Sequence, residues 1–146
     1  IYLSPRGTKF DQTFAKDLSK EQGAIFICGR YEGVDERFLI YNNVIEVSVG
    51  DFILSGGEIG AQLMIDATVR LLPNVIGNSI GLVEESFENN LLEYPLYTYP
   101  RVWNELEVPE VLLSGDHKRI KKWKTEMSEK LTKSKRPDLW SKYIKS

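Results

Sequence analysis

The stretch that decides the fold class runs from Val44 to Leu72 and reads VIEVSVGDFILSGGEIGAQLMIDATVRLL. Its first part, Val44–Val49, predicts a strand that ends at Gly50-Asp51. Its last part predicts a helix over Ile59–Leu72, stopped by Pro73. Four apolar positions of this helix share one face: Ile59, Leu63, Ala67 and Leu71. A strand followed by a glycine-rich turn and a helix is the repeating unit of a parallel α/β sheet.

The residues before this stretch repeat the alternation of helix and strand. Phe10–Lys20 carries apolar residues four positions apart, which predicts an amphipathic helix. Ala24–Cys28 is a continuous apolar run that ends at Gly29, a pattern typical of a strand buried on both faces. Val34–Tyr41 predicts a short helix. The first half of the chain is therefore predicted to be an α/β domain with a parallel sheet.

The residues after this stretch lose the alternation. From Asn74 to Asn90, turn residues and an acidic cluster predict an exposed linker. Asp116 is a good N-cap for a basic helix from His117 to about Leu131, and a last short helix is predicted to begin at Arg136-Pro137-Asp138. The C-terminal part is thus predicted to be small and mainly helical.

Composition excludes several classes of protein. The chain is 42% apolar and 27% charged, which is ordinary for a soluble globular protein. Neither a charged-then-apolar leader nor an apolar run near the roughly 20 residues of a membrane span is present, so we expect no membrane. A single cysteine, Cys28, cannot form an internal disulfide, which favours a reducing cytoplasm. With His117 as the one histidine, we expect no zinc site and no Ser-His-Asp catalysis.

Charge is distributed unevenly along the chain. Residues 117–146 hold 11 Lys and Arg against 3 acidic side chains, whereas the remaining residues hold 8 basic and 18 acidic ones. A basic module attached to an acidic body suggests a polyanionic partner for the module. The alternative is an ordinary solvated basic helix, and charge alone does not decide between the two.

Three glycine-containing segments are predicted to lie at strand ends: Tyr2–Gly7, Cys28–Gly33 and Ser48–Glu58. Open parallel sheets bind ligands outside the carboxyl ends of their strands. Glycine there lets main-chain groups approach a flat ligand such as adenine. No G-x-G-x-x-G and no G-x-x-x-x-G-K-[ST] is present, which argues against a standard dinucleotide site or P-loop. These residues alone indicate small-molecule loops, with three ordinary turns as the alternative.

Four segments together resemble a known family. They are Tyr2-Leu-Ser-Pro-x-Gly7, Cys28-Gly-Arg-Tyr-Glu-Gly-Val-Asp-Glu-Arg37, Val49-Gly-Asp-Phe-Ile-Leu-Ser-Gly-Gly-Glu58 and Val111-Leu-Leu-Ser-Gly115. In this order they strongly resemble the bacterial tRNA (guanine-N(1)-)-methyltransferases, the TrmD family. The resemblance covers nearly the whole chain and includes Arg136-Pro-Asp-Leu139.

This resemblance implies a SPOUT-type α/β fold in which residues 29–58 thread a deep trefoil knot, a rare exception to unknotted connections. It implies a knotted cofactor-binding domain over residues 1–76, a flexible interdomain linker over 77–90, and a basic helical tRNA-binding domain over 91–146. It also implies a homodimer with an active site shared between protomers. Family members carry a further portion of the knotted domain before the residue that matches Ile1, so we expect this chain to be a fragment.

The resemblance also implies S-adenosyl-L-methionine as methyl donor, with S-adenosyl-L-homocysteine as product. Glu32 would face the cationic end of this cofactor, and a surface carboxylate is the alternative for that residue. Carried over by motif, the cofactor-binding residues are Tyr2, Leu3, Ser4, Pro5, Gly7, Gly29, Tyr31, Glu32, Gly33, Val49, Gly50, Asp51, Phe52, Ile53, Leu54, Gly56 and Gly57.

Methylation of a guanine ring nitrogen also needs a base, because that nitrogen carries a proton. The family places an Asp before Ser-Phe in the linker, and Glu85 stands at that position here, with Glu84 as the alternative. The matching arginine is Arg70, which could hold the carboxylate or the anion that develops on guanine. An i,i+4 pair with Asp66 is the alternative for Arg70.

The family resemblance implies that the basic module of residues 117–146 binds the anticodon arm of tRNA. Five cations would contact phosphates: Lys118, Arg119, Lys121, Lys122 and Lys124. Trp123 lies among them in the sequence. We interpret it as a core residue in preference to a platform on which an RNA base stacks. The predicted reaction is methylation of N(1) of the guanine just 3′ of the anticodon, in the cytoplasm. A ribose-methylating SPOUT enzyme and a non-catalytic RNA- or cofactor-binding module remain as alternatives.

Besides Glu85, the sequence departs from the family pattern at three further places. Gly60 stands where the family has proline at the start of the helix, and Leu96 and Tyr99 stand where it has histidine and arginine. Arg101 could replace part of the lost positive charge. These differences fall on the start of the helix and on residues near the linker.

Overall fold

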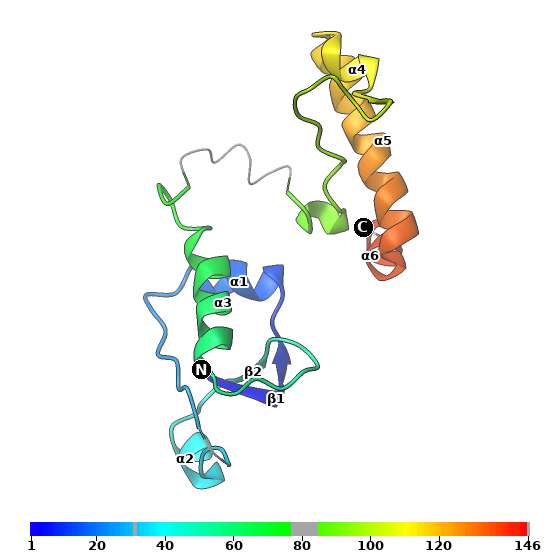
Figure 1. Ribbon diagram of the computed structural model, residues 1–146. Helices are drawn as coiled ribbons and strands as arrows, with labels where there is room; N and C mark the ends of the chain where they lie inside the picture. Colours follow the sequence, from blue (N-terminus) through cyan, green and yellow to red (C-terminus); the bar gives the residue numbers. More distant parts are fainter. Residues whose placement is uncertain (31, 77–84, 146) are drawn as a thin grey trace. The chain divides into compact units, whose positions relative to one another are not determined.

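The computed structural model describes residues 1–30, 32–76 and 85–145. They form two compact units, Ile1–Ser79 and Ile80–Ser146, each drawn in Figure 1. The first unit is a mixed α/β structure with a small parallel sheet, and the second is mainly helical. None of the helices in the described ranges has the length and apolar character needed to cross a membrane.

The sheet of the first unit pairs β1 (Tyr2–Lys9) with β2 (Glu46–Ser48) in parallel. The register is irregular between Leu3 and Thr8, because Val47 is the partner of both residues. Tyr2–Gly7, predicted as a loop, is thus part of a strand. The main-chain N–H of Tyr2 donates to Ile45 O at 2.9 Å, which extends the contact beyond β2.

The predicted strand Ala24–Cys28 is wrong in its extent. Ile27 alone forms a β-bridge, parallel to Tyr2, and its N–H donates to Ile1 O at 2.8 Å. Ile25 is 83% exposed, so the apolar run is not buried on both faces within this unit. An apolar run predicts burial, but it does not by itself supply the neighbouring strands that a ladder needs.

Three helices accompany this sheet. They are α1 (Gln12–Leu18), α2 (Glu36–Tyr41) and α3 (Glu58–Val69). Asp11 caps α1 by accepting from Phe14 N at 3.0 Å, and α1 packs beside α3 (Figure 1). α1 and α2 lie within the ranges predicted for them, whereas α3 begins one residue before the predicted Ile59 and ends three residues before the predicted Leu72.

The residues that α3 buries are not the four apolar residues predicted to share one face. The helix buries Gly60, Ala61, Met64 and Thr68, whereas Ile59 is 64% exposed and Leu63 46% exposed. Apolar residues surround this helix almost completely, so periodicity did not select one face. The buried face is instead the one with small residues, which allow close packing. Gly60 lies so close to the Leu3 side chain that a Cβ on Gly60 would be 2.6 Å from Leu3 Cδ1.

The second unit is built on α5 (His117–Lys135). Asp116 caps it as predicted, since its carboxylate accepts from the N–H groups of Lys118 and Arg119 at 3.0 and 3.1 Å. The helix ends four residues after the predicted Leu131, and α6 (Pro137–Tyr143) follows at once. Thr132 of α5 is fully buried, and its hydroxyl accepts from Leu92 N at 2.8 Å.

Smaller elements complete the second unit. They are the 3₁₀ turn η2 (Glu88–Asn90), a hairpin of β3 (Val102–Trp103) and β4 (Leu106–Glu107), and α4 (Glu110–Leu113). Residues 77–84 of the predicted linker lie outside the described residues. Ser86 of the same linker accepts from Glu93 N at 2.9 Å within the second unit.

Candidate functional site

The three glycine-containing segments surround one cleft of about 430 Å³ in the first unit. Its volume falls in the range of small-molecule sites, and its walls combine apolar side chains with glycine main chain. Fourteen of the predicted cofactor-binding residues line it: Tyr2, Leu3, Ser4, Pro5, Gly29, Glu32, Gly33, Val49, Gly50, Phe52, Ile53, Leu54, Gly56 and Gly57.

The remaining three predicted cofactor-binding residues stand apart from this lining. Tyr31 lies outside the described residues, and neither Gly7 nor Asp51 lines the cleft. Gly7 serves the sheet instead, because a Cβ there would collide with the main chain of Val47. No side chain could be accommodated at Gly7 unless β1 moved away from β2.

The walls of the cleft meet through close main-chain packing. Gly57 lies against Cys28, where a Cβ on Gly57 would be 3.0 Å from Cys28 Cα. Gly29 lies against the Tyr2 ring, where a Cβ on Gly29 would be 3.1 Å from Tyr2 Cε2. Glycine at these two positions lets the Cys28–Gly33 segment fit between β1 and the start of α3.

Two charged residues line the cleft, Arg30 and Glu32. Arg30 binds Glu58 at the start of α3, with Nε and Nη2 at 3.1 and 2.8 Å from Oε1. The pKa of the Glu58 carboxyl is lowered, first by a hydrogen bond from its own main chain and then by Arg30. The pair therefore joins the Cys28–Gly33 segment to the segment that ends in Gly56-Gly57.

Sequence reasoning missed four lining residues: Arg30, Val47, Ser48 and Ser55. All but Val47 lie inside the quoted segments, so reading each segment as a continuous wall would have included them. Ser48 is 93% buried, and its Oγ lies 3.3 Å from both Gly50 N and Gly50 O. It holds the turn by which the chain leaves β2 and enters the cleft wall.

The two predicted catalytic residues belong to different units. Arg70 follows α3 in the first unit, is half-buried, and donates its main-chain N–H to Asp66 O at 3.2 Å. Glu85 is half-buried in the second unit. Arg70 does not line the cleft. Glu84, the alternative base, lies outside the described residues.

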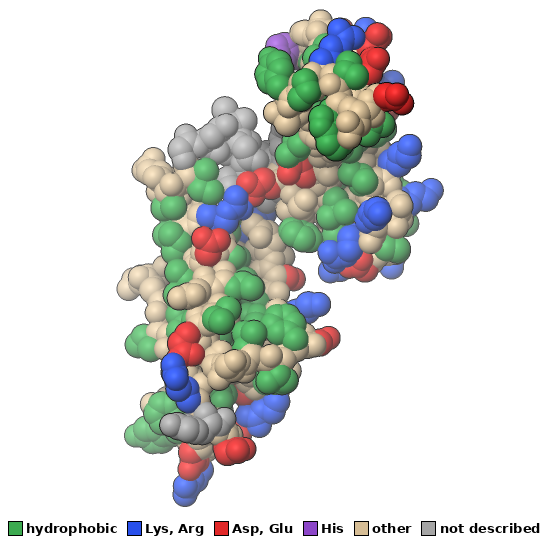
Figure 2. Space-filling view, in the orientation of Figure 1, with side chains coloured by type: hydrophobic (Ala, Val, Ile, Leu, Met, Phe, Trp, Pro, Cys, Tyr) green, Lys and Arg blue, Asp and Glu red, His purple; other side chains and the backbone are tan. Residues whose placement is uncertain are grey.

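The predicted RNA-binding cations lie on α5 and differ in their surroundings. Lys118, Arg119, Lys121 and Lys122 are exposed, and Figure 2 shows Lys and Arg side chains along this part of the second unit. Lys124 is half-buried, with its Nζ 4.5 Å from the centre of the Tyr94 ring.

Trp123 packs against two tyrosine rings instead of standing free. The ring centres of Tyr94 and Tyr97 lie 6.4 and 6.2 Å from that of Trp123. Edge-on and tilted contacts at this separation are favourable aromatic packing. Trp123 therefore anchors the segment before the β3–β4 hairpin on α5.

Comparison with known proteins identifies the family. The family model described as tRNA (Guanine-1)-methyltransferase TrmD matches residues 1–142. The chain belongs to this family. Its TrmD relatives include proteins named tRNA (guanine-N(1)-)-methyltransferase from Pelagibacter ubique, 57% identical over 146 residues, and Roseobacter denitrificans, 55% identical over 141 residues. A third, from Cereibacter sphaeroides, is 54% identical over 143 residues.

These alignments cover nearly all of this TrmD chain but only part of each relative. They include 100%, 97% and 98% of the chain, and 64%, 58% and 57% of the three relatives in the same order. The chain thus spans about three fifths of their length.

The cleft fits the methyl donor that membership of the TrmD family implies. Adenine is typically bound by apolar surface with main-chain groups at its edge, and the cleft lining includes Leu3, Phe52 and Leu54 together with glycines. The charged end of such a donor needs polar partners, and the charged side chains of Arg30 and Glu32 are part of the lining. Among the described residues, no three His, Cys, Asp or Glu side chains gather in a way that could hold a metal ion.

Proposed function

We propose that the protein containing this chain transfers a methyl group from S-adenosyl-L-methionine to N(1) of the guanine just 3′ of the anticodon in tRNA. The observation that carries the proposal is the single cleft lined by three separate segments of a TrmD family chain. The proposal includes the SPOUT-type knot through residues 29–58. It also includes a homodimer that shares its active site and works in the cytoplasm.

The cleft is proposed to hold and orient the methyl donor. When bound, S-adenosyl-L-methionine supplies an electrophilic methyl carbon on a sulfonium centre. The glycine segments bind the adenine through main-chain groups, while Glu32 faces the cationic end. Phe52, Ile53 and Leu54 supply apolar surface to this cleft. We propose that Gly7 and Asp51 act through the shape of the sheet and the turn, and not by contact with the donor.

Glu85 is proposed to be the base and Arg70 the partner of the developing charge. The carboxylate removes the proton from guanine N(1), and the lone pair left there forms the new N–C bond as the S–C bond breaks. Negative charge that develops on the guanine carbonyl oxygen is stabilised by the Arg70 guanidinium. The products are N(1)-methylguanine in tRNA, S-adenosyl-L-homocysteine and a proton on Glu85.

The exposed cations of α5 are proposed to bind the phosphates of the anticodon arm. Lys118, Arg119, Lys121 and Lys122 project into solvent, and only Lys122 has a described acidic partner among these four, Glu126 at 3.8 Å. At such a separation on the surface the pair is weak and leaves the positive charge available to phosphate. Lys124, which lies over Tyr94, is proposed to contribute charge from a more fixed position.

The proposal is tested with the full-length protein, labelled methyl donor, and tRNA transcripts that differ only at the guanine beside the anticodon. We expect label in the transcript that carries this guanine and none in the transcript that lacks it. Glu85→Gln should nearly abolish turnover while leaving cofactor affinity within a few-fold, because the amide cannot accept the proton.

Two results would overturn this assignment in different ways. Undiminished labelling by Glu85→Gln would remove Glu85 from the mechanism and favour ribose methylation, which needs no carboxylate in the linker. Tight binding of both cofactor and tRNA without any methylated product would instead favour a non-catalytic binding module.

A further inference from the structure

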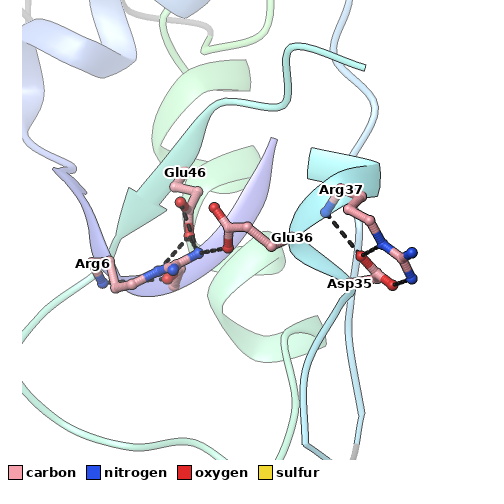
Figure 3. Close-up of polar contacts among 6 residues, drawn as sticks. Arg6, Asp35, Glu36, Arg37 and Glu46 are labelled. Atoms are coloured by element: carbon pink, nitrogen blue, oxygen red, sulfur yellow. Dashed lines mark hydrogen bonds and ion pairs between the residues drawn. The ribbon is translucent and has the colours of Figure 1, made fainter. Parts of the chain in front are cut away.

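A network of charged groups joins β1, β2 and α2 beside the cleft, and Arg6 is its centre (Figure 3). The Arg6 Nη2 donates to Glu46 Oε2 and to Glu36 Oε2, both at 2.9 Å, and its Nε donates to Glu46 Oε2 at 3.2 Å. One guanidinium therefore bridges a carboxylate of β2 and a carboxylate of α2. Such forked contacts fix geometry as well as charge.

This network reaches the cleft through Ser4. Ser4 is a buried residue of the cleft wall, and its Oγ accepts a hydrogen bond from Arg6 N at 3.3 Å. A hydrogen bond from the same hydroxyl is the first cause, ahead of Arg6, of the lowered pKa of the Glu46 carboxyl. Pro5, which also lines the cleft, precedes Arg6 directly. Arg6 therefore directly follows two residues that line the cleft, and its side chain reaches Glu36 of α2.

Another part of the cleft lining lies on a loop. Residues 29–35 contain the lining residues Glu32 and Gly33 and form no helix or strand in their described part. Arg30–Glu58 fastens the beginning of this loop to α3, at 2.8 Å. Arg6–Glu36 fastens α2, which begins immediately after the loop, to β1.

We propose that Arg6 is a positioning residue that sets the width of the cofactor cleft by holding α2, and with it Glu32 and Gly33, against β1. This inference rests on the proposed function, because it assigns the cleft to S-adenosyl-L-methionine. Without the Arg6–Glu36 ion pair the loop moves with α2. Binding of the donor must then also order the loop. Cofactor affinity falls, while the chemistry on the bound donor is unchanged.

The test measures binding of S-adenosyl-L-homocysteine to the full-length protein by isothermal titration calorimetry. Arg6→Gln and Glu36→Gln each remove the link to α2, and we expect each to raise Kd roughly 1.5- to fivefold. The double variant should be no weaker than Arg6→Gln, because both changes cut one link. The turnover rate at saturating cofactor should stay within twofold of the wild type. Arg6→Lys should recover part of the affinity.

Arg37→Gln is the matched control. Arg37 is also a cation near α2, but it pairs with Asp35 within its own turn, at 2.7 Å, and does not join α2 to the sheet (Figure 3). We expect its Kd to equal that of the wild type. Equal Kd values for Arg6→Gln and Arg37→Gln would overturn the inference, as would additive losses in the double variant. A lower melting temperature for Arg6→Gln with unchanged Kd would reduce Arg6 to a structural residue.

The outcome for the wild type separates this inference from the proposed function. Failure of the wild-type protein to bind S-adenosyl-L-homocysteine overturns the proposed function and the inference with it. Binding by the wild type that survives Arg6→Gln and Glu36→Gln unchanged overturns the role of Arg6 alone.

Discussion

Thr132→Val is expected to destabilise the second unit through one unsatisfied hydrogen-bond donor. The Thr132 hydroxyl makes two hydrogen bonds: it accepts from Leu92 N at 2.8 Å and donates to Ser128 O at 2.7 Å. Valine has nearly the same volume, so the substitution leaves no cavity. The main-chain carbonyl of Ser128 keeps its own helical hydrogen bond, so the loss falls mainly on the N–H of Leu92.

The expected loss in free energy of unfolding is about 1–3 kcal/mol, the cost of leaving such a donor without a partner. Thr132 is 0% exposed, so water cannot replace the hydroxyl without opening the contact. An opening cost reduced by 1–3 kcal/mol raises the population of the open state roughly 5- to 150-fold, and the Leu92 amide should exchange its hydrogen faster by the same factor.

Thr125→Val is the control for this prediction. Thr125 lies on the exposed side of the same helix, and its hydroxyl donates only to Lys121 O at 3.2 Å. We expect its effect on stability to stay within about 0.5 kcal/mol. Hydrogen exchange measured on both variants checks the reasoning. If the Leu92 amide exchanges equally fast in Thr132→Val and Thr125→Val, the buried hydroxyl does not hold this segment to α5.

Two further predictions concern charge in the second unit. Replacing Lys121 and Lys122 by Glu should weaken tRNA binding and make it less sensitive to salt, since each phosphate contact contributes about 0.7–0.9 to the slope of log K against log salt concentration. Filter binding at several salt concentrations measures this, and an equal loss of cofactor affinity would indicate unfolding instead. The Arg136 guanidinium is the first cause that lowers the pKa of Asp138 from 3.8 to about 2. Because this pKa is depressed in the folded state, the stabilisation is fully present above about pH 4 and is lost as the pH falls through about 2. The stability difference between wild type and Asp138→Asn should therefore shrink over that interval, and a difference independent of pH would contradict the assignment.

Local signals in the sequence predicted local structure well. The cap at Asp116 and the positions of the first-unit helices follow from short-range hydrogen bonds and periodicity, and the structure confirms them. The family resemblance also selected segments that line one cleft, although no periodicity could have shown that they meet.

Long-range contacts were harder to predict from the sequence. The buried face of α3 depends on which residues allow close approach, and there the small Gly60 and Ala61 prevailed over the larger Ile59 and Leu63. Ala24–Cys28 has the composition of a buried strand, yet a ladder depends on neighbours that the run itself does not encode. At Gly7 the main chain of β1 packs so closely on that of Val47 that no side chain fits, a contact that the motif alone did not show.

The division into two units separates donor binding from proton removal in the proposed mechanism. Every residue that lines the cleft, and every residue of the Arg6 network, belongs to the first unit. Glu85 belongs to the second unit, together with the cations proposed to bind tRNA. Substitutions at Arg6 should therefore change cofactor affinity and spare turnover, and substitutions at Glu85 should do the reverse.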